Sequence, residues 1–150
     1  KTSSKRLATK RLKELFQKNG VLESVKFLNR AKFKDHLDNY NLIDLALDTF
    51  PYNGVTTSFE AIWMGVPVLT MAGYNFNSRC GESINKNLNM EQLIAKDEED
   101  YVSKAVSLAS EREKFLNLRK SIFLDAIKSP LFDEKKFAGN FFRLINEISL

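Results

Sequence analysis

Residues 45–70 decide the fold, and they read LALDTFPYNGVTTSFEAIWMGVPVLT. An apolar run rich in strand-forming residues, 43–50, leads into this stretch and breaks at the Pro-Tyr-Asn-Gly turn of 51–54. The hydroxyl pair Thr56–Thr57 then predicts the start of a helix that ends at Gly65, and a second apolar strand follows at 66–70. Strand, turn, helix and strand in this order predict a βαβ unit with two parallel strands.

The turn of this unit is the first candidate for a binding site. Unpaired backbone N–H groups and the positive end of the helix dipole gather at a helix N-terminus and attract phosphate. Thr56 and Thr57 would add hydroxyl donors, and Glu60, one turn further, is placed to accept from a ribose hydroxyl. The spacing of Thr57 and Glu60 also fits a capping box, in which the carboxylate folds back on the helix end. The two interpretations can partly coexist.

The rest of the chain alternates between apolar and polar stretches in a way that predicts more helices than strands. Ser3 or Ser4 is expected to cap a first helix ending near Lys18 at the Asn19–Gly20 stop, and Asp35 a short one. The predicted helices are 4–18, 35–40, 78–87, 97–110, 111–127 and 133–148, and the additional strands are 25–28 and 93–94. We therefore expect an α/β domain: a Rossmann-like parallel sheet flanked by helices, with a helical tail over about 97–150.

Composition bounds the class of protein. The 150 residues are 43% hydrophobic and 28% charged, which fits one globular domain, and the chain lacks an initiator methionine, so we expect a piece of a longer protein. The net charge of +4 is concentrated in the first 35 residues, where a solvated helix face is the favoured explanation. Because Phe16, Phe27 and Phe33 are expected at core or strand positions, nucleic acid is not an expected partner.

Cysteine and histidine are scarce. Cys80 and His36 are the single residues of their types, which excludes an internal disulfide and the usual metal clusters. No run approaches the ~18 apolar residues of a membrane span. We therefore expect a protein of a reduced, cytoplasmic compartment.

Several side chains outside the turn are candidates for chemistry. His36 follows the predicted strand 25–28, at the sheet edge where open α/β folds bind ligands. Asp48, near the end of the central strand, is more readily a structural carboxylate than an acid or base. Arg79 can meet an anion or form a surface ion pair, and Cys80 is expected as a small buried side chain.

The motifs taken together resemble the C-terminal catalytic lobe of the O-linked N-acetylglucosamine transferase family, which includes plant Spindly-type and bacterial members. The Asn-Gly-x-Thr-Thr turn, the Trp-x-Gly-x-Pro helix exit and the Ser-Pro-Leu-Phe break occur in the family's order, at 53–57, 63–67 and 129–132. The resemblance implies one lobe of a GT-B glycosyltransferase that needs no metal or other cofactor. It extends from about residue 25 to the C-terminus.

The resemblance also implies site residues. The implied nucleotide contacts are Ala31, His36, Asn53, Gly54, Thr56, Thr57 and Glu60. Val55 and Phe33 depart from the family, which has histidine and lysine at those places in its animal members. The family's glutamine and lysine that brace the diphosphate precede the region covered, and no residue here is an obvious general base.

The implied function is that of the donor-binding lobe of an inverting glycosyltransferase. It would transfer a sugar, expected to be N-acetylglucosamine, from a UDP-sugar to protein Ser or Thr hydroxyls. The expected partners are the nucleotide-sugar donor, a protein acceptor, and an N-terminal lobe with tetratricopeptide repeats in the same protein. The alternatives are the same fold with another donor or acceptor (GDP-fucose, a glycan, an asparagine) and a non-catalytic nucleotide-binding domain.

Overall fold

The computed structural model describes residues 2–148, with side chains from residue 7 onward, and divides into two compact units between Lys32 and Phe33. The N-terminal unit contains helix α1 (Thr2–Lys18) and the 3-10 turn η1 (Leu22–Ser24). Since α1 begins at Thr2, Ser3 and Ser4 lie inside the helix, and the prediction that one of them caps it is wrong. The predicted stop is confirmed, because Gly20 has φ +69°, a conformation that favours glycine.

The strand predicted at 25–28 is absent from the described secondary structure. Val25 is extended, with φ −105° and ψ 121°, but residues 25–32 form neither helix nor strand. Alternation alone cannot make a strand, because a strand also needs a hydrogen-bonded neighbour. Phe27 instead packs edge-on against Phe16 at 6.2 Å between ring centroids, and Lys13 Nζ lies 5.5 Å from the Phe27 ring centre.

The second unit contains a three-stranded parallel sheet in the order β1-β2-β3. Its strands are β1 (Ala46–Leu47), β2 (Val68–Met71) and β3 (Ile94–Ala95). Ala46 pairs with Val68, and Thr70 pairs with Ile94. All four β2 residues are buried, as expected of a central strand covered on both faces. The predicted βαβ unit is confirmed, but its first strand has two residues rather than eight.

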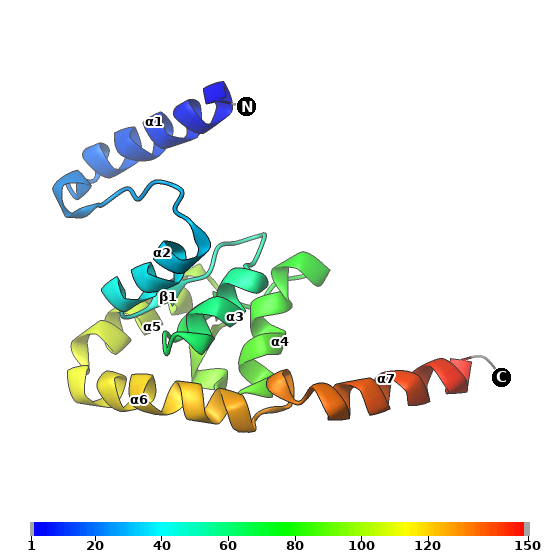
Figure 1. Cartoon of the computed structure of the whole chain (residues 1–150). Coiled ribbons are helices and arrows are strands. Elements are labelled where there is room, and N and C mark those ends of the chain that lie inside the picture. Colours follow the sequence, from blue (N-terminus) through cyan, green and yellow to red (C-terminus); the bar gives the residue numbers. More distant parts are fainter. Residues whose placement is uncertain (1, 149–150) are drawn as a thin grey trace. The chain divides into compact units, whose positions relative to one another are not determined.

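Short helical elements connect these strands (Figure 1). Helix α2 (Phe33–Asp38) and turn η2 (Asn39–Leu42) precede β1, α3 (Thr56–Trp63) joins β1 to β2, and turn η3 (Phe76–Ser78), α4 (Cys80–Asn87) and turn η4 (Glu91–Leu93) join β2 to β3. Asp35 lies in the first turn of α2 and does not precede the helix as a cap. Gly65, with φ +75°, follows α3 as predicted.

The helical tail is confirmed. It consists of α5 (Glu98–Ser110), α6 (Arg112–Lys128), turn η5 (Pro130–Phe132) and α7 (Glu134–Ile148). The three helices lie within one residue of the predicted bounds, and positions 149–150 of the predicted tail lie outside the described residues. Asp97 caps α5 by accepting a hydrogen bond from the Asp100 N–H at 2.8 Å. Every residue of α7 is exposed.

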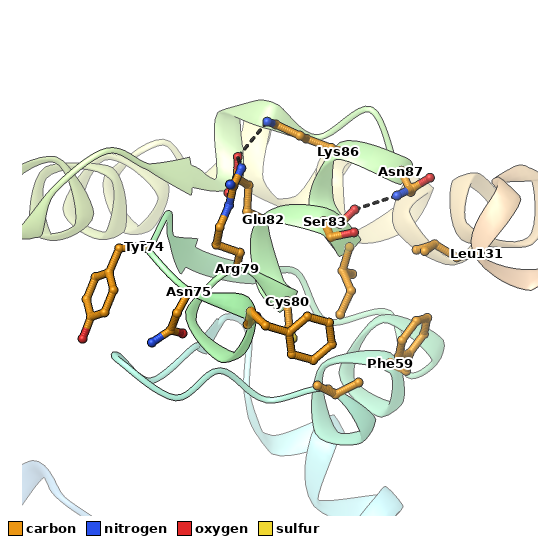
Figure 2. Close-up of a pocket in the computed structure, with 13 residues that line it drawn as sticks. Phe59, Tyr74, Asn75, Arg79, Cys80, Glu82, Ser83, Lys86, Asn87 and Leu131 are labelled. Carbon is orange, nitrogen blue, oxygen red and sulfur yellow. Dashed lines mark hydrogen bonds and ion pairs between the residues drawn. The ribbon is translucent and has the colours of Figure 1, made fainter. Parts of the chain in front are cut away.

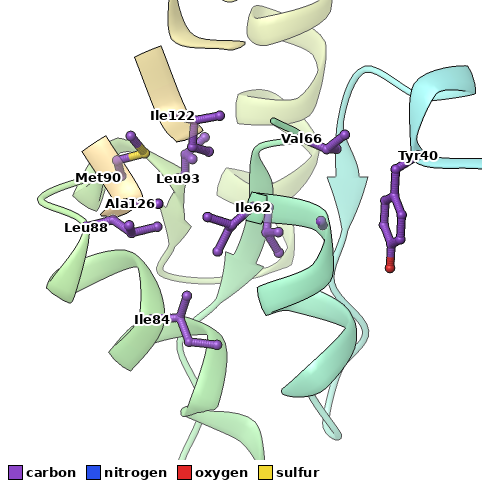
Figure 3. Close-up of a cluster of buried hydrophobic side chains, with 11 residues drawn as sticks. Tyr40, Ile62, Val66, Ile84, Leu88, Met90, Leu93, Ile122 and Ala126 are labelled. Atoms are coloured by element: carbon purple, nitrogen blue, oxygen red, sulfur yellow. The ribbon is translucent and has the colours of Figure 1, made fainter. Parts of the chain in front are cut away.

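The core of the second unit lies between the sheet and helices α3, α4 and α6 (Figure 3). Its buried side chains are Tyr40, Ala61, Ile62, Val66, Val68, Ile84, Leu88, Met90, Leu93, Ile122 and Ala126. Ile62, Leu93 and Ile122 are fully buried, so α3, turn η4 and α6 are fixed around one apolar centre. Across residues 2–148, none of the helices combines the length and apolar character needed to cross a membrane.

Candidate functional site

The N-terminus of α3 is open. Val55 occupies the N-cap position, and Thr56 and Thr57 are both exposed. Within residues 2–148 no side chain caps this helix, so the predicted capping box between Thr57 and Glu60 is wrong. The first backbone N–H groups of α3 therefore remain free to bind an anion from solution, with two threonine hydroxyls beside them.

Glu60 turns instead toward α2 and turn η2. Its Oε2 lies 3.1 Å from His36 Nε2, and the Tyr40 hydroxyl donates to the same carboxylate at 3.3 Å. Tyr40 also donates to the Thr57 carbonyl at 3.2 Å, and its ring packs edge-on against His36 with 5.4 Å between centroids. Burial and the Glu60 charge raise the pKa of Tyr40 to about 12. The structure thus brings His36, Thr57 and Glu60 together on one side of α3.

Asp48 holds the loop before α3 in place. Its Oδ1 accepts from the Gly54 N–H and its Oδ2 from the Thr70 hydroxyl, each at 2.8 Å, while Tyr101 donates to its carbonyl at 2.8 Å. Burial raises the pKa of Asp48, and the bonds from Gly54 and Thr70 oppose that rise. The favoured interpretation of Asp48 as a structural carboxylate is confirmed.

Asn53 and Gly54 shape the same loop. The Asn53 amide donates to the Thr49 carbonyl at 2.9 Å and accepts from the Gly81 N–H at 3.2 Å, so its buried side chain ties the loop to α4. A Cβ on Gly54 would collide with the Thr57 hydroxyl oxygen. Both residues therefore shape the site by determining the path of the loop backbone. A small cavity of about 190 Å³ lies behind this loop, between Tyr40 and Thr57.

The remaining candidates are Ala31, Arg79 and Cys80. Ala31 belongs to the N-terminal unit, and the α3 site to the second unit. Arg79 forms an ion pair, which is one of its two predicted alternatives, with its Nε 2.8 Å from Glu82 Oε2. Cys80 is half-buried, less than expected, and its thiol donates to the Phe76 carbonyl at 3.3 Å. Among residues 2–148, no three His, Cys, Asp or Glu side chains are placed to share a metal ion.

Sequence reasoning missed a larger groove between α3 and α4, with a volume of about 730 Å³ (Figure 2). It missed Tyr40 as well, although its position four residues after His36 gives helical spacing to the same face. The sequence feature that could have indicated the groove is the Tyr74-Asn75-Phe76 run after Gly73, which places two aromatic residues in a loop. Both aromatic side chains are strongly exposed, Tyr74 at 78% and Phe76 at 85%.

Comparison with known proteins places this geometry in a family. The pattern of glycosyl transferase family 41 matches residues 7–141. The chain is 44% identical over 106 residues to the probable UDP-N-acetylglucosamine–peptide N-acetylglucosaminyltransferase SPINDLY of Solanum lycopersicum, and 32% identical over 122 residues to the UDP-N-acetylglucosamine–peptide N-acetylglucosaminyltransferase of Caenorhabditis elegans. These alignments cover 71% and 81% of the chain but 11% of each relative.

A solved structure gives the same result for the fold. A mutant of the Thermobaculum terrenum O-GlcNAc transferase superposes with a TM-score of 0.86 at 30% identity, covering 94% of this chain and 27% of that one. The predicted fold class, a parallel sheet flanked by helices like the lobe of a GT-B enzyme, is confirmed. The family resemblance read from the motifs is confirmed with it.

Proposed function

Because the chain belongs to glycosyl transferase family 41, we propose that it is the donor-binding lobe of an inverting glycosyltransferase. The donor is a UDP-sugar, with N-acetylglucosamine as the sugar, and the acceptor is a Ser or Thr hydroxyl of a protein. The names of the relatives support the donor and acceptor classes. One structural observation carries the assignment: an uncapped helix N-terminus with two exposed threonines lies directly beside a histidine–carboxylate pair.

The α3 N-terminus receives the diphosphate in this proposal. Free backbone N–H groups and the helix dipole favour an anion there, and the exposed hydroxyls of Thr56 and Thr57 add two donors. Two residues keep the preceding loop away from the ligand in this proposal. Gly54 has no Cβ, and the Asn53 side chain forms hydrogen bonds with Thr49 and Gly81.

The nucleoside lies on the side of α3 that faces α2. His36, whose side chain is 44% exposed, offers a flat ring to the base. Glu60 accepts from a ribose hydroxyl while Tyr40 and His36 hold its carboxylate. We assign Ala31 a backbone contact with the base on the strength of the family resemblance.

Transfer proceeds by attack of the acceptor oxygen on the anomeric carbon. The bond from that carbon to the diphosphate oxygen breaks, UDP departs with the electron pair, and the hydroxyl proton is released. The lobe lowers the barrier by placing N–H groups and hydroxyls where negative charge develops on the leaving group. We propose that these donors take the place of a metal ion, and no general base is assigned to this chain.

The chain spans 11% of the length of the curated relatives named above. We propose an N-terminal lobe and tetratricopeptide repeats as its partners within the same protein, and a cytoplasmic location with Cys80 reduced. Neither nucleic acid nor a membrane enters the proposal.

A non-catalytic nucleotide-binding domain is the second candidate. Val55 and Phe33 favour it, because apolar side chains, 47% and 69% exposed, stand where animal family members carry polar ones. It predicts nucleotide binding without turnover. A preference for GDP over UDP would point to a fucosyltransferase of the same fold.

The first test is calorimetric titration of the protein with UDP and with GDP. Thr57→Val, which removes one hydroxyl and keeps the shape, should weaken UDP binding about tenfold, the value of a hydrogen bond to a charged group. His36→Ala should weaken it as well, and His36→Phe should restore part of the loss by keeping a flat ring.

Ser103→Ala, which removes an exposed hydroxyl from α5, is the matched control and should leave UDP affinity unchanged. Tight UDP binding that neither Thr57→Val nor His36→Ala affects would contradict the assigned site. Absence of binding to either nucleotide would contradict the proposed function.

A further inference from the structure

Helix α3 separates two surfaces. Tyr40 and His36 contact it on the side of Thr57 and Glu60, where we place the nucleoside. Val55 and Phe59, one helical turn apart, line the groove between α3 and α4 on another face. Val55, the N-cap residue of α3, brings the groove to the helix end where we place the diphosphate. With the nucleoside on the side of α2, we take the donor sugar to point toward the groove.

The groove continues well past that point. Its lining runs along α4 from Arg79 to Asn87 and ends at Leu131 of turn η5 (Figure 2). Helix α4 has eight residues, which corresponds to about 12 Å. That length exceeds one sugar ring and matches about three to four residues of extended polypeptide.

The two edges of the groove differ in chemistry. The apolar part of the lining includes Phe59, Phe76, Cys80 and Leu131. The other edge carries Arg79 and Lys86, and both bind the single carboxylate of Glu82, at 2.8 and 2.7 Å. The Glu82 side chain is 11% exposed, whereas those of Arg79 and Lys86 are 57% and 54% exposed. Two cations for one sheltered carboxylate leave the solvent-facing edge positively charged.

We propose that this groove binds the acceptor polypeptide beside the hydroxyl that receives the sugar. The segment bound would place an apolar side chain against Phe59 and Leu131 and an acidic side chain near Arg79 and Lys86. Its chemistry is thus an extended, partly acidic peptide, and charge complementarity together with the length of the groove favours it over a second sugar. This inference rests on the proposed function for the direction in which the donor sugar points.

The test separates peptide binding from donor binding. Two labelled synthetic peptides serve as probes: one has a serine flanked by leucine and, about three residues on, glutamate, and the other has lysine in place of the glutamate. Ser83 is exposed and lies in the groove between the charged edge and the apolar wall, so Ser83→Tyr should obstruct it (Figure 2). Ser103→Tyr on α5 is the matched control, an exposed serine outside the described cavities.

We expect Ser83→Tyr to weaken binding of the acidic peptide, or to raise its KM in transfer, at least tenfold, with UDP affinity within twofold of the parent. Ser103→Tyr should change neither quantity. Lys86→Glu should reverse the preference between the two peptides. The thermal unfolding midpoint of each variant is measured alongside, so that loss of fold is recognised.

Other outcomes overturn the inference in distinct ways. If Ser83→Tyr folds and binds the acidic peptide as the parent does, the groove is not the acceptor site. If it instead raises the KM for the donor and leaves the peptide unaffected, the groove holds the donor sugar. If UDP fails to bind the parent protein, the proposed function fails. Fluorescence titration with the two peptides then still decides whether the groove binds a peptide.

Discussion

Three carboxylates of this chain show how surroundings assign a role to one kind of side chain. Asp48 is held by a backbone N–H and a hydroxyl, and its burial raises its pKa. The Glu60 carboxylate contacts both His36 and Tyr40 at the candidate nucleoside surface. Glu82 is bound by Arg79 and Lys86, and their hydrogen bonds lower its pKa to about 2. The sequence favoured a structural role for Asp48, but it did not predict that Glu60 would contact His36 and Tyr40.

The pKa of Glu82 makes stability depend on pH. Its ordinary value is 4.5, so its ionised form stabilises the fold fully above about pH 4.5, and that contribution is lost as pH falls toward about 2. Glu82→Gln should lower the free energy of unfolding at pH 7 by about 1–2 kcal/mol, because both cations are half-exposed and screened. Urea unfolding at pH 7 and pH 3 measures the difference, which should shrink at the lower pH.

Glu147→Gln, at an exposed position of α7, is the matched control and should have little effect at either pH. A deficit for Glu82→Gln that stays constant from pH 7 to pH 3 would show that the lost contribution is packing rather than charge.

At the scale of elements, hydrogen bonds tie the loop that precedes α3 to the first turn of α4. Asn53 accepts from the Gly81 N–H, and Asp48 accepts from both Gly54 and Thr70. These bonds couple the first turn of α4 to the loop that opens α3. The polar network thereby fixes the candidate diphosphate site and one end of the groove.

Gly81 sets how closely α4 approaches β2. A Cβ there would collide with the Thr70 hydroxyl oxygen and lie 2.5 Å from Asp48 Oδ2. Gly81→Ala should therefore lower the free energy of unfolding by about 1–3 kcal/mol, the usual cost of overpacking, and weaken UDP binding through the displaced loop. Calorimetric unfolding and the UDP titration measure the two effects.

Gly139 in α7 provides the matched comparison, since nothing lies within 4 Å of an added Cβ. Gly139→Ala should leave stability unchanged or raise it by up to about 1 kcal/mol, because alanine favours a helix. Equal effects of the two substitutions would refute close packing at Gly81 as the cause.

At the scale of the whole molecule, the matches extend across both units while covering a small part of each relative. The family pattern spans residues 7–141, and the solved transferase is covered over 27% of its length. Transfer is therefore a property to be measured on the intact protein, whereas the proposed donor binding is tested by the substitutions in this chain.

Metal removal tests the proposed source of leaving-group stabilisation. If the α3 N–H groups and the hydroxyls of Thr56 and Thr57 suffice, treatment of the intact protein with EDTA should leave the transfer rate unchanged. A fall in rate that magnesium or manganese restores would contradict the proposal. The rate of the dialysed, untreated protein is the reference.

Much of the fold could be predicted because local patterns agree with it. The turn at 51–54, the exit of α3 at Gly65 and the tail helices were predicted from residues that determine backbone geometry or helical periodicity nearby. Failures occurred where a distant partner was needed. The strand at 25–28 lacked a described neighbour, and the eight-residue strand at 43–50 shortened to two. Strand pairing is a tertiary contact that alternation cannot supply.

The sequence by itself determined the βαβ unit, the helical tail and the family, because turn chemistry, periodicity and ordered motifs are local properties. Only the tertiary structure decided what the polar side chains do. It turned Glu60 from a helix cap to a partner of His36 and Tyr40, made Asn53 part of the loop, and opened a groove beside Phe59. Hydrogen bonds and cavities depend on which elements pack together, and that choice is made by the whole core at once.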